Sequence, residues 1–194
     1  MSKLPSVYSF PPLYTRQPNS LIRRQQINTW IDLILQYCKS NNSWSMSAEG
    51  KLIVDKGNTE INSSTGLNNE KSFFLNEEIQ RAASEAFIDE IWLQMFQEGK
   101  ALKSERGQSS STYYILWKSL DLWASLILQW FESSVKLNQV VTLYELSQGD
   151  ESIGWEFHGM PEPLLAQCIK PLCDRNRATI LKDEFDRPVG LKVI

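Results

Sequence analysis

The chain carries the same order of secondary-structure signals twice in succession: a helix, a short strand, helices and a β-hairpin. In the first half, Ser20 is a candidate N-cap for a helix that extends to about Lys39, with apolar residues at helical spacing. Serines and apolar residues alternate at 44–48, as in a short strand, and the polar stretch at 49–72 is typical of a loop. A further helical pattern spans 76–99, long enough for two short helices, and ends at a glycine suited to a helix C-terminus.

The first half closes with a predicted hairpin of residues 100–104 and 113–117 around a polar tip at 105–111. The second half starts with a helix over 118–133 whose apolar residues cover more than one side, which indicates burial against two surfaces. The signals that follow repeat the order of the first half: a strand at 139–142, a helical turn at 143–147, a helix from Met160 and a hairpin of 178–182 with 189–194.

This order is the plan of a winged-helix domain, a small helical bundle backed by a β-hairpin, and no linker separates the two copies. With 194 residues, the chain is long enough for two small domains. We therefore predict a mainly α-helical fold with small β-hairpins, of the α+β class, built from tandem winged-helix domains at 20–117 and 118–194 after an arm at 1–19. A single longer all-helical domain is the structural alternative.

Residues 1–19 form the predicted arm, because prolines and aromatic residues occur there together without a helical pattern, which is typical of an extended segment. Pro11, Pro12 and Tyr14 match a PPxY pattern, and Phe10 and Tyr8 lengthen its apolar strip. A polyproline-like segment loses little conformational freedom when its rings dock in an aromatic groove, so the arm is a candidate ligand for a partner protein. The pattern is short, and the alternative is an arm packed on the protein's own core.

Composition and charge argue against several functions. The formal net charge of -3 does not fit a protein whose main task is to neutralise nucleic-acid phosphates or to coat an anionic membrane. The single histidine, His158, has no nucleophile or metal-ligand spacing around it, and the glycines form no phosphate-binding loop, so we expect neither catalysis nor a cofactor or metal. Three cysteines, one of which must stay unpaired, and the lack of an apolar leader or spanning stretch predict a cytoplasmic protein.

DNA binding is the alternative function, because winged helices often place their third helix in the major groove. In the first domain that helix would cover 79–98, where acidic residues outnumber the single Arg81. In the second domain, Lys170, Arg175 and Arg177 are offset by acidic neighbours. We interpret these charges as solvated surface residues of a protein that serves as an interaction scaffold. A winged-helix DNA-binding transcription factor is the less favoured alternative, since the acidic helix would repel phosphate.

Five blocks of the sequence closely resemble one protein family. They are PPLYTRQP at 11–18, RRQQ at 23–26, FIDEIW at 87–92, ILWKSL at 115–120 and KPLCDRNRA at 170–178. The family they resemble is that of vacuolar protein sorting-associated protein 25, the smallest subunit of ESCRT-II, and the similarity to fungal members is strongest. The resemblance covers nearly the whole chain apart from residues 49–72.

This resemblance implies a tandem winged-helix subunit, present in two copies in a Y-shaped complex with two larger subunits, that acts in sorting ubiquitinated cargo into multivesicular bodies. In the family, PPxY-type segments insert into pockets on the C-terminal winged helices of the larger subunits. That role is thereby implied for Pro11, Pro12, Leu13 and Tyr14, and an arginine at the position of Arg81 supports the same contact.

An earlier copy of the motif reads Pro5-Ser6-Val7-Tyr8, with serine in place of the second proline, and is expected to be a weaker contact. The second domain, 118–194, is implied to recruit the first ESCRT-III subunit and to nucleate ESCRT-III assembly, whereas lipid binding belongs to other subunits. We thus expect a non-enzymatic adaptor in the cytoplasm that reaches the endosomal membrane through its partners and binds no nucleic acid. A free ligand for WW domains, which also read PPxY segments, is a second rival.

Overall fold

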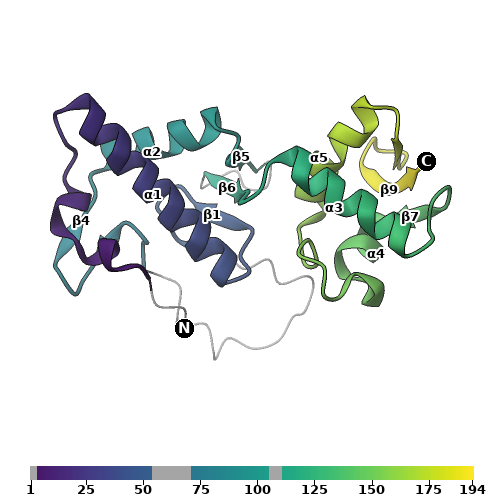
Figure 1. Ribbon diagram of the computed structural model, residues 1–194, viewed down its shortest axis with the longest axis horizontal. Helices are drawn as coiled ribbons and strands as arrows, with labels where there is room; N and C mark the ends of the chain where they lie inside the picture. Colours follow the sequence, from purple (N-terminus) through teal and green to yellow (C-terminus); the bar gives the residue numbers. More distant parts are fainter. Residues whose placement is uncertain (1–3, 54–70, 105–110) are drawn as a thin grey trace. The chain divides into compact units, whose positions relative to one another are not determined.

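The computed structural model describes residues 4–53, 71–104 and 111–194, which form two compact units, Met1–Trp117 and Lys118–Ile194 (Figure 1). Most of the loop predicted at 49–72 and nearly all of the hairpin tip predicted at 105–111 lie outside the described residues.

In the first unit, α1 (Ser20–Ser40) is capped by Asn19, whose side-chain oxygen accepts hydrogen bonds from the backbone amides of Leu21 and Ile22 at 2.9 and 3.1 Å. The N-cap is therefore one residue before the predicted Ser20, because Asn19 satisfies two of the free amides of the first turn. The helix packs on α2 (Glu85–Gln97). Its buried apolar residues are Trp30, Ile31, Leu33, Ile34 and Cys38.

Helix α2 begins later than the helix predicted from Asn76. Asn76 lies instead in strand β3 (Leu75–Asn76), which pairs with β4 (Arg81–Ala82). The side-chain oxygen of Asn76 accepts a hydrogen bond from the amide of Glu78, and its Nδ2 donates to the carbonyl of Tyr8 at 3.1 Å. Because this side chain is used by a turn and by the N-terminal segment, it does not cap a helix.

A four-stranded antiparallel sheet in the order β2-β1-β6-β5 completes the first unit. Met46 lies opposite Leu52 on one side and Tyr113 on the other, and these side chains join the core that α1 and α2 form. The predicted hairpin of the first half is present as β5 and β6. The strands are β1 (Ser45–Ser47), β2 (Leu52–Ile53), β5 (Ala101–Lys103) and β6 (Thr112–Ile115).

The second unit repeats the order of helix, strand, helices and hairpin. Its elements are α3 (Leu120–Ser133), β7 (Val140–Thr142), α4 (Leu143–Gln148), the 3-10 turn η3 (Asp150–Ser152), α5 (Glu162–Asp174), β8 (Ala178–Lys182) and β9 (Pro188–Val193). The sheet order is β7-β9-β8, and α3 packs on α5 with Trp123 and Phe131 fully buried. The predicted α+β class with tandem winged-helix units is therefore confirmed.

The N-terminal segment is not extended, contrary to the prediction. Ser6–Ser9 form the 3-10 turn η1, and Pro11–Tyr14 form the 3-10 turn η2. Proline fixes φ at about −65°, a value that 3-10 turns and extended polyproline share, so the prolines alone do not distinguish the two conformations. The burial of Leu13 and Tyr14 in the core of the first unit favours the 3-10 turn over the extended conformation. The arm, residues 4–19, is thus a folded part of the first unit.

Candidate partner-binding site

The arm lies on one side of the first unit, where η2 runs against strand β4, and its dark purple ribbon can be followed in Figure 1. The residues predicted to bind partners divide into two groups by exposure. Phe10 is 55% exposed and Pro11 and Pro12 are also exposed, whereas Leu13 and Tyr14 keep only 4% and 3% of their surface. The start of the PPxY motif therefore faces solvent, and its end enters the core.

Tyr14 is a core residue of the first unit. Its ring meets the ring of Trp30 edge to face with centroids 5.2 Å apart, and the ring of Tyr8 at 6.0 Å. Its hydroxyl donates a hydrogen bond of 2.7 Å to the Tyr8 carbonyl, and burial raises the pKa of Tyr14. A WW domain would reach this ring only after the arm had left the core, which weighs against the WW-ligand rival.

The earlier copy of the motif, from Pro5 to Tyr8, is also bound to its own unit. Tyr8 stacks on Phe73 at 5.2 Å, and its hydroxyl donates to the Phe73 carbonyl at 2.9 Å. Its own carbonyl accepts hydrogen bonds from the hydroxyl of Tyr14 and from Asn76 Nδ2. The Pro5 carbonyl accepts the Tyr8 amide at 2.9 Å, and burial together with the neighbouring Tyr14 raises the pKa of Tyr8. Tyr8 thus holds the arm against the first unit, and Pro5 contributes a hydrogen bond within the arm.

The backbone of the arm is held by Gln26 of α1, a residue that the sequence did not single out. Gln26 is 7% exposed, and its Nε2 lies 3.1, 2.9 and 2.8 Å from the carbonyl oxygens of Pro12, Leu13 and Thr15. Its Oε1 accepts the amide of Gln17 at 3.2 Å. The available signal in the sequence was a glutamine four residues before Trp30, on the buried stripe of a helix that is otherwise apolar there.

Arg81 is exposed, and the strand that carries it, β4, lies next to η2. The structure therefore brings Arg81 into the neighbourhood of the PPxY turn, which is distant from it in sequence. Just past that turn, Arg16 Nε lies 2.6 Å from Glu90 Oε1, and Arg23 Nε lies 3.6 Å from Glu90 Oε2. These ion pairs tie the end of the arm and the start of α1 to α2. We call the exposed residues Phe10, Pro11, Pro12 and Arg81 the arm surface.

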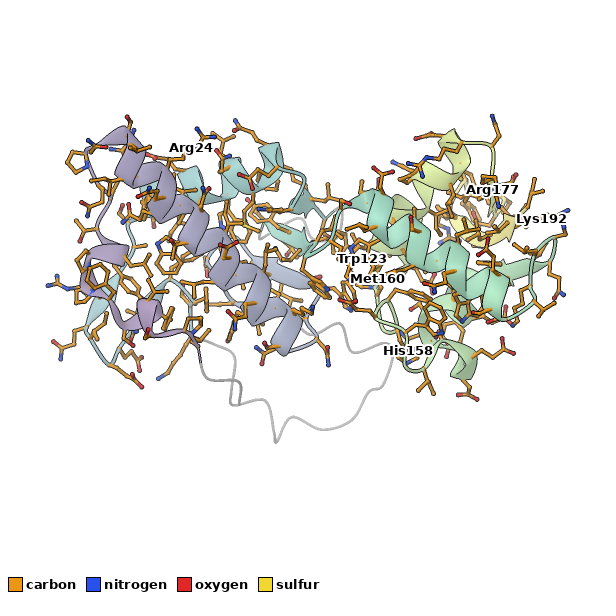
Figure 2. All side chains as sticks on the ribbon, viewed as in Figure 1. Arg24, Trp123, His158, Met160, Arg177 and Lys192 are labelled. Atoms are coloured by element: carbon orange, nitrogen blue, oxygen red, sulfur yellow. The ribbon has the colours of Figure 1, made fainter. Side chains whose placement is uncertain are left out.

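The remaining histidine and cysteine side chains, which could in principle take part in chemistry, contact other residues within the fold or are buried. The Nδ1 atom of His158 lies 2.7 Å from the hydroxyl of Ser152, and Figure 2 shows His158 well apart from Arg177 and Lys192 within the second unit. Burial raises the pKa of the Cys38 and Cys168 thiols to about 12. Among residues 4–53, 71–104 and 111–194, no three His, Cys, Asp or Glu side chains gather as a metal site. No helix in these stretches is both long and apolar enough to cross a lipid bilayer.

The helices that would read DNA carry unsuitable charge. Helix α2 has three acidic residues and no lysine or arginine, and Arg81 lies outside it, in β4, rather than on the helix predicted at 79–98. In the second unit, Arg175 pairs with Asp121 at 2.6 Å, and Arg177 Nε donates to the carbonyl of Ile194. These charges disfavour an approach to phosphate.

Known proteins resemble this chain over its whole length. The model of the ESCRT-II complex subunit family matches residues 7–161. Vacuolar protein-sorting-associated protein 25 of Saccharomyces cerevisiae is 62% identical over all of both chains, and that of Xenopus laevis is 32% identical over 91% of each. The crystal structure of subunit VPS25 of the endosomal trafficking complex ESCRT-II matches at 60% identity with a TM-score of 0.84 over all of both chains. A chain in the crystal structure of endosomal complex ESCRT-II (VPS22/VPS25/VPS36) matches at 60% identity with a TM-score of 0.81, again over all of both chains. The chain therefore belongs to the ESCRT-II complex subunit family.

Proposed function

We propose that this chain is the VPS25-type subunit of ESCRT-II in vacuolar protein sorting and assembles with the two larger subunits, VPS22 and VPS36. The observation that carries the proposal is the full-length match, at 60% identity, to a chain in the solved complex of these three subunits. Its role is structural rather than enzymatic, because Ser152, whose hydroxyl lies 2.7 Å from His158 Nδ1, is fully buried and out of reach of a substrate. It works in the cytoplasm and reaches the endosomal membrane through its partners.

The arm surface makes the contact with the larger subunits. Phe10, Pro11 and Pro12 offer an exposed apolar strip, and Arg81 adds a cation that can pair with an acidic group at the rim of a partner pocket. Exposed aromatic and arginine side chains are enriched among residues that dominate binding energy. Leu13, Tyr14 and Tyr8 hold this strip in shape, because their contacts within the first unit leave little of them free for a partner. Pro5 supports Tyr8 through the hydrogen bond of its carbonyl with the Tyr8 amide.

Binding of the purified pair of larger subunits, measured by calorimetry, tests the arm surface. The double variant Phe10→Ala with Pro11→Ala is expected to weaken binding at least about tenfold, equal to about 1.4 kcal/mol, while leaving the thermal stability of the free chain unchanged. Leu122→Ala is the matched control, because Leu122 is 56% exposed, close to the 55% of Phe10, but lies in the second unit. Equal affinities of the double variant and the unmodified chain would contradict the proposed contact.

The second unit recruits the first ESCRT-III subunit and nucleates ESCRT-III assembly. Two copies of the chain on one complex would place two recruiting units close together, which raises their effective concentration without any new contact. Sedimentation of the assembled complex with the first ESCRT-III subunit tests this stoichiometry. Two bound ESCRT-III subunits per complex support it, and binding that persists when residues 118–194 are deleted opposes it.

A further inference from the structure

Gln26 stands among apolar residues on the buried side of α1, where Trp30, Ile31 and Ile34 complete the stripe. A buried polar side chain is unfavourable unless its donors and acceptors are satisfied. Within the described part of the chain, the arm satisfies Gln26, since each hydrogen bond of its side-chain amide goes to a backbone atom between Pro12 and Gln17. Apolar packing alone therefore does not explain why a glutamine occupies this position of α1.

The chemistry of this contact requires a glutamine. Its Nε2 has two protons and lies within hydrogen-bond distance of three converging carbonyls, while its Oε1 accepts the amide of Gln17. A carboxylate of the same length has no donor for the carbonyls, and an apolar side chain has neither donor nor acceptor. Trp30 adds one further donor, from Nε1 to the Leu13 carbonyl at 3.0 Å, but does not reach the other groups.

The three carbonyls are those at which η2 ends and the chain turns toward α1. The Pro12 carbonyl accepts a hydrogen bond from the Thr15 amide at 3.3 Å within the turn, and Gln17 Nε2 lies 3.4 and 2.9 Å from the carbonyls of Pro12 and Thr15. Without Gln26, the Leu13 carbonyl would keep Trp30 and those of Pro12 and Thr15 would keep these partners, but each carbonyl would lose one donor and the Gln17 amide would lose its side-chain acceptor. Gln26 reaches all three carbonyls and also accepts a hydrogen bond from the Gln17 amide, so its loss shifts the equilibrium from the folded arm, which Leu13 and Tyr14 anchor in the core, toward an arm released into water.

We propose that Gln26 is a positioning residue for partner binding: it holds the arm in its folded turn, so that Phe10, Pro11 and Pro12 meet the larger subunits in a fixed arrangement. This inference rests on the proposed function of the arm surface. A chain whose binding-competent form is only partly populated binds with an affinity reduced by that fraction. Gln26 therefore raises affinity without touching the partner.

The experiment compares Gln26→Met with Gln25→Met in the full chain. Methionine keeps the length of the side chain and removes its hydrogen bonds, and Gln25 is an exposed neighbour on the same helix. Hydrogen exchange of the amide of Leu13, a buried residue whose amide donates to the Phe10 carbonyl at 3.0 Å within the turn, reports release of the arm, and calorimetry with the purified larger subunits reports affinity. We expect Gln26→Met to speed exchange at Leu13 and to weaken binding about tenfold, with no change of either for Gln25→Met.

A double-mutant cycle separates positioning from a general loss of structure. In a chain that already carries Phe10→Ala with Pro11→Ala, Gln26→Met should weaken binding by no more than about twofold, because most of the contact that it positions is gone. Should Gln26→Met fail to fold, Gln26→Glu replaces it, since glutamate retains the acceptor for Gln17 and loses the donors. Unchanged exchange at Leu13, or faster exchange with unchanged affinity, overturns the inference. Unchanged affinity of the Phe10→Ala, Pro11→Ala variant instead overturns the proposed function, whatever Gln26 does.

Discussion

Replacement of Tyr14 by alanine tests whether this tyrosine supports the arm or contacts the partner directly. Tyr14 is 3% exposed, packs edge to face on Trp30, and donates its hydroxyl proton to the Tyr8 carbonyl. Truncation of a buried aromatic side chain costs about 3 to 5 kcal/mol, through lost burial and the cavity that remains. We therefore expect Tyr14→Ala to lower the unfolding free energy of the first unit by about 3 kcal/mol or more in the free chain, with no partner present.

Tyr14→Phe separates the contribution of the hydroxyl from that of the buried ring. It removes only the hydroxyl, and the Tyr8 carbonyl still accepts a hydrogen bond from Asn76 Nδ2, so the expected loss is about 1 kcal/mol or less. Amide hydrogen exchange along α1 in increasing urea follows the first unit separately, which matters because a chain of two units need not unfold in one step. Tyr144→Ala is the control, since Tyr144 is 64% exposed and should change stability by no more than about 0.5 kcal/mol.

The opposite result would refute the reasoning. If Tyr14→Ala left the free chain within about 0.5 kcal/mol of its original stability and yet abolished binding of the larger subunits, Tyr14 would be a contact residue and the arm would leave the core to bind. A loss of stability that accounts for the loss of binding supports the folded arm.

Three further predictions concern local features. Asn19→Ala should destabilise the first unit by about 1 kcal/mol and Ser20→Ala by less, as measured by urea unfolding, because Asn19 caps α1; the reverse order would restore Ser20 as the cap. The pKa values of Tyr8 and Tyr14 are raised on folding, so the folded state keeps these protons more tightly than the unfolded chain. The free energy of unfolding should therefore be intact below about pH 10 and fall as the pH rises above it, less steeply in Tyr14→Phe. A pH-independent unfolding midpoint would contradict this. Cys173, which is half-buried, should react first with a thiol reagent at about pH 8, while Cys38 and Cys168 stay protected until unfolding; mass spectrometry of the labelled chain checks the order.

Local patterns predicted most of the elements. The periodicity of α3 and the hairpin of residues 178–182 with 189–194, which is present as β8 and β9, depend on neighbouring residues, so the sequence alone indicated them. The family blocks added the resemblance to an ESCRT-II subunit, which the comparison with known proteins confirmed.

The prediction of a helix that begins at Asn76 is wrong because of a tertiary contact. The sequence around Asn76 contains a good cap and two glutamates, but Asn76 is buried against the arm, where its side chain binds the Tyr8 carbonyl across 68 positions of sequence. A contact of that range is invisible to a local pattern, and it overrides the weak preference of a single cap.

The sequence by itself determined that the arm carries a PPxY motif and that its prolines restrict the backbone. Only the tertiary structure decided which of its residues face outward. Tyr14 is buried because α1 supplies Trp30 and η1 supplies Tyr8, and the arm backbone is held because Gln26 lies on the buried stripe of α1. The exposure of a residue depends on which other segments pack against it. The sequence therefore left open whether the motif is a free ligand or an arm packed on the core, and the structure shows a folded, partly buried turn.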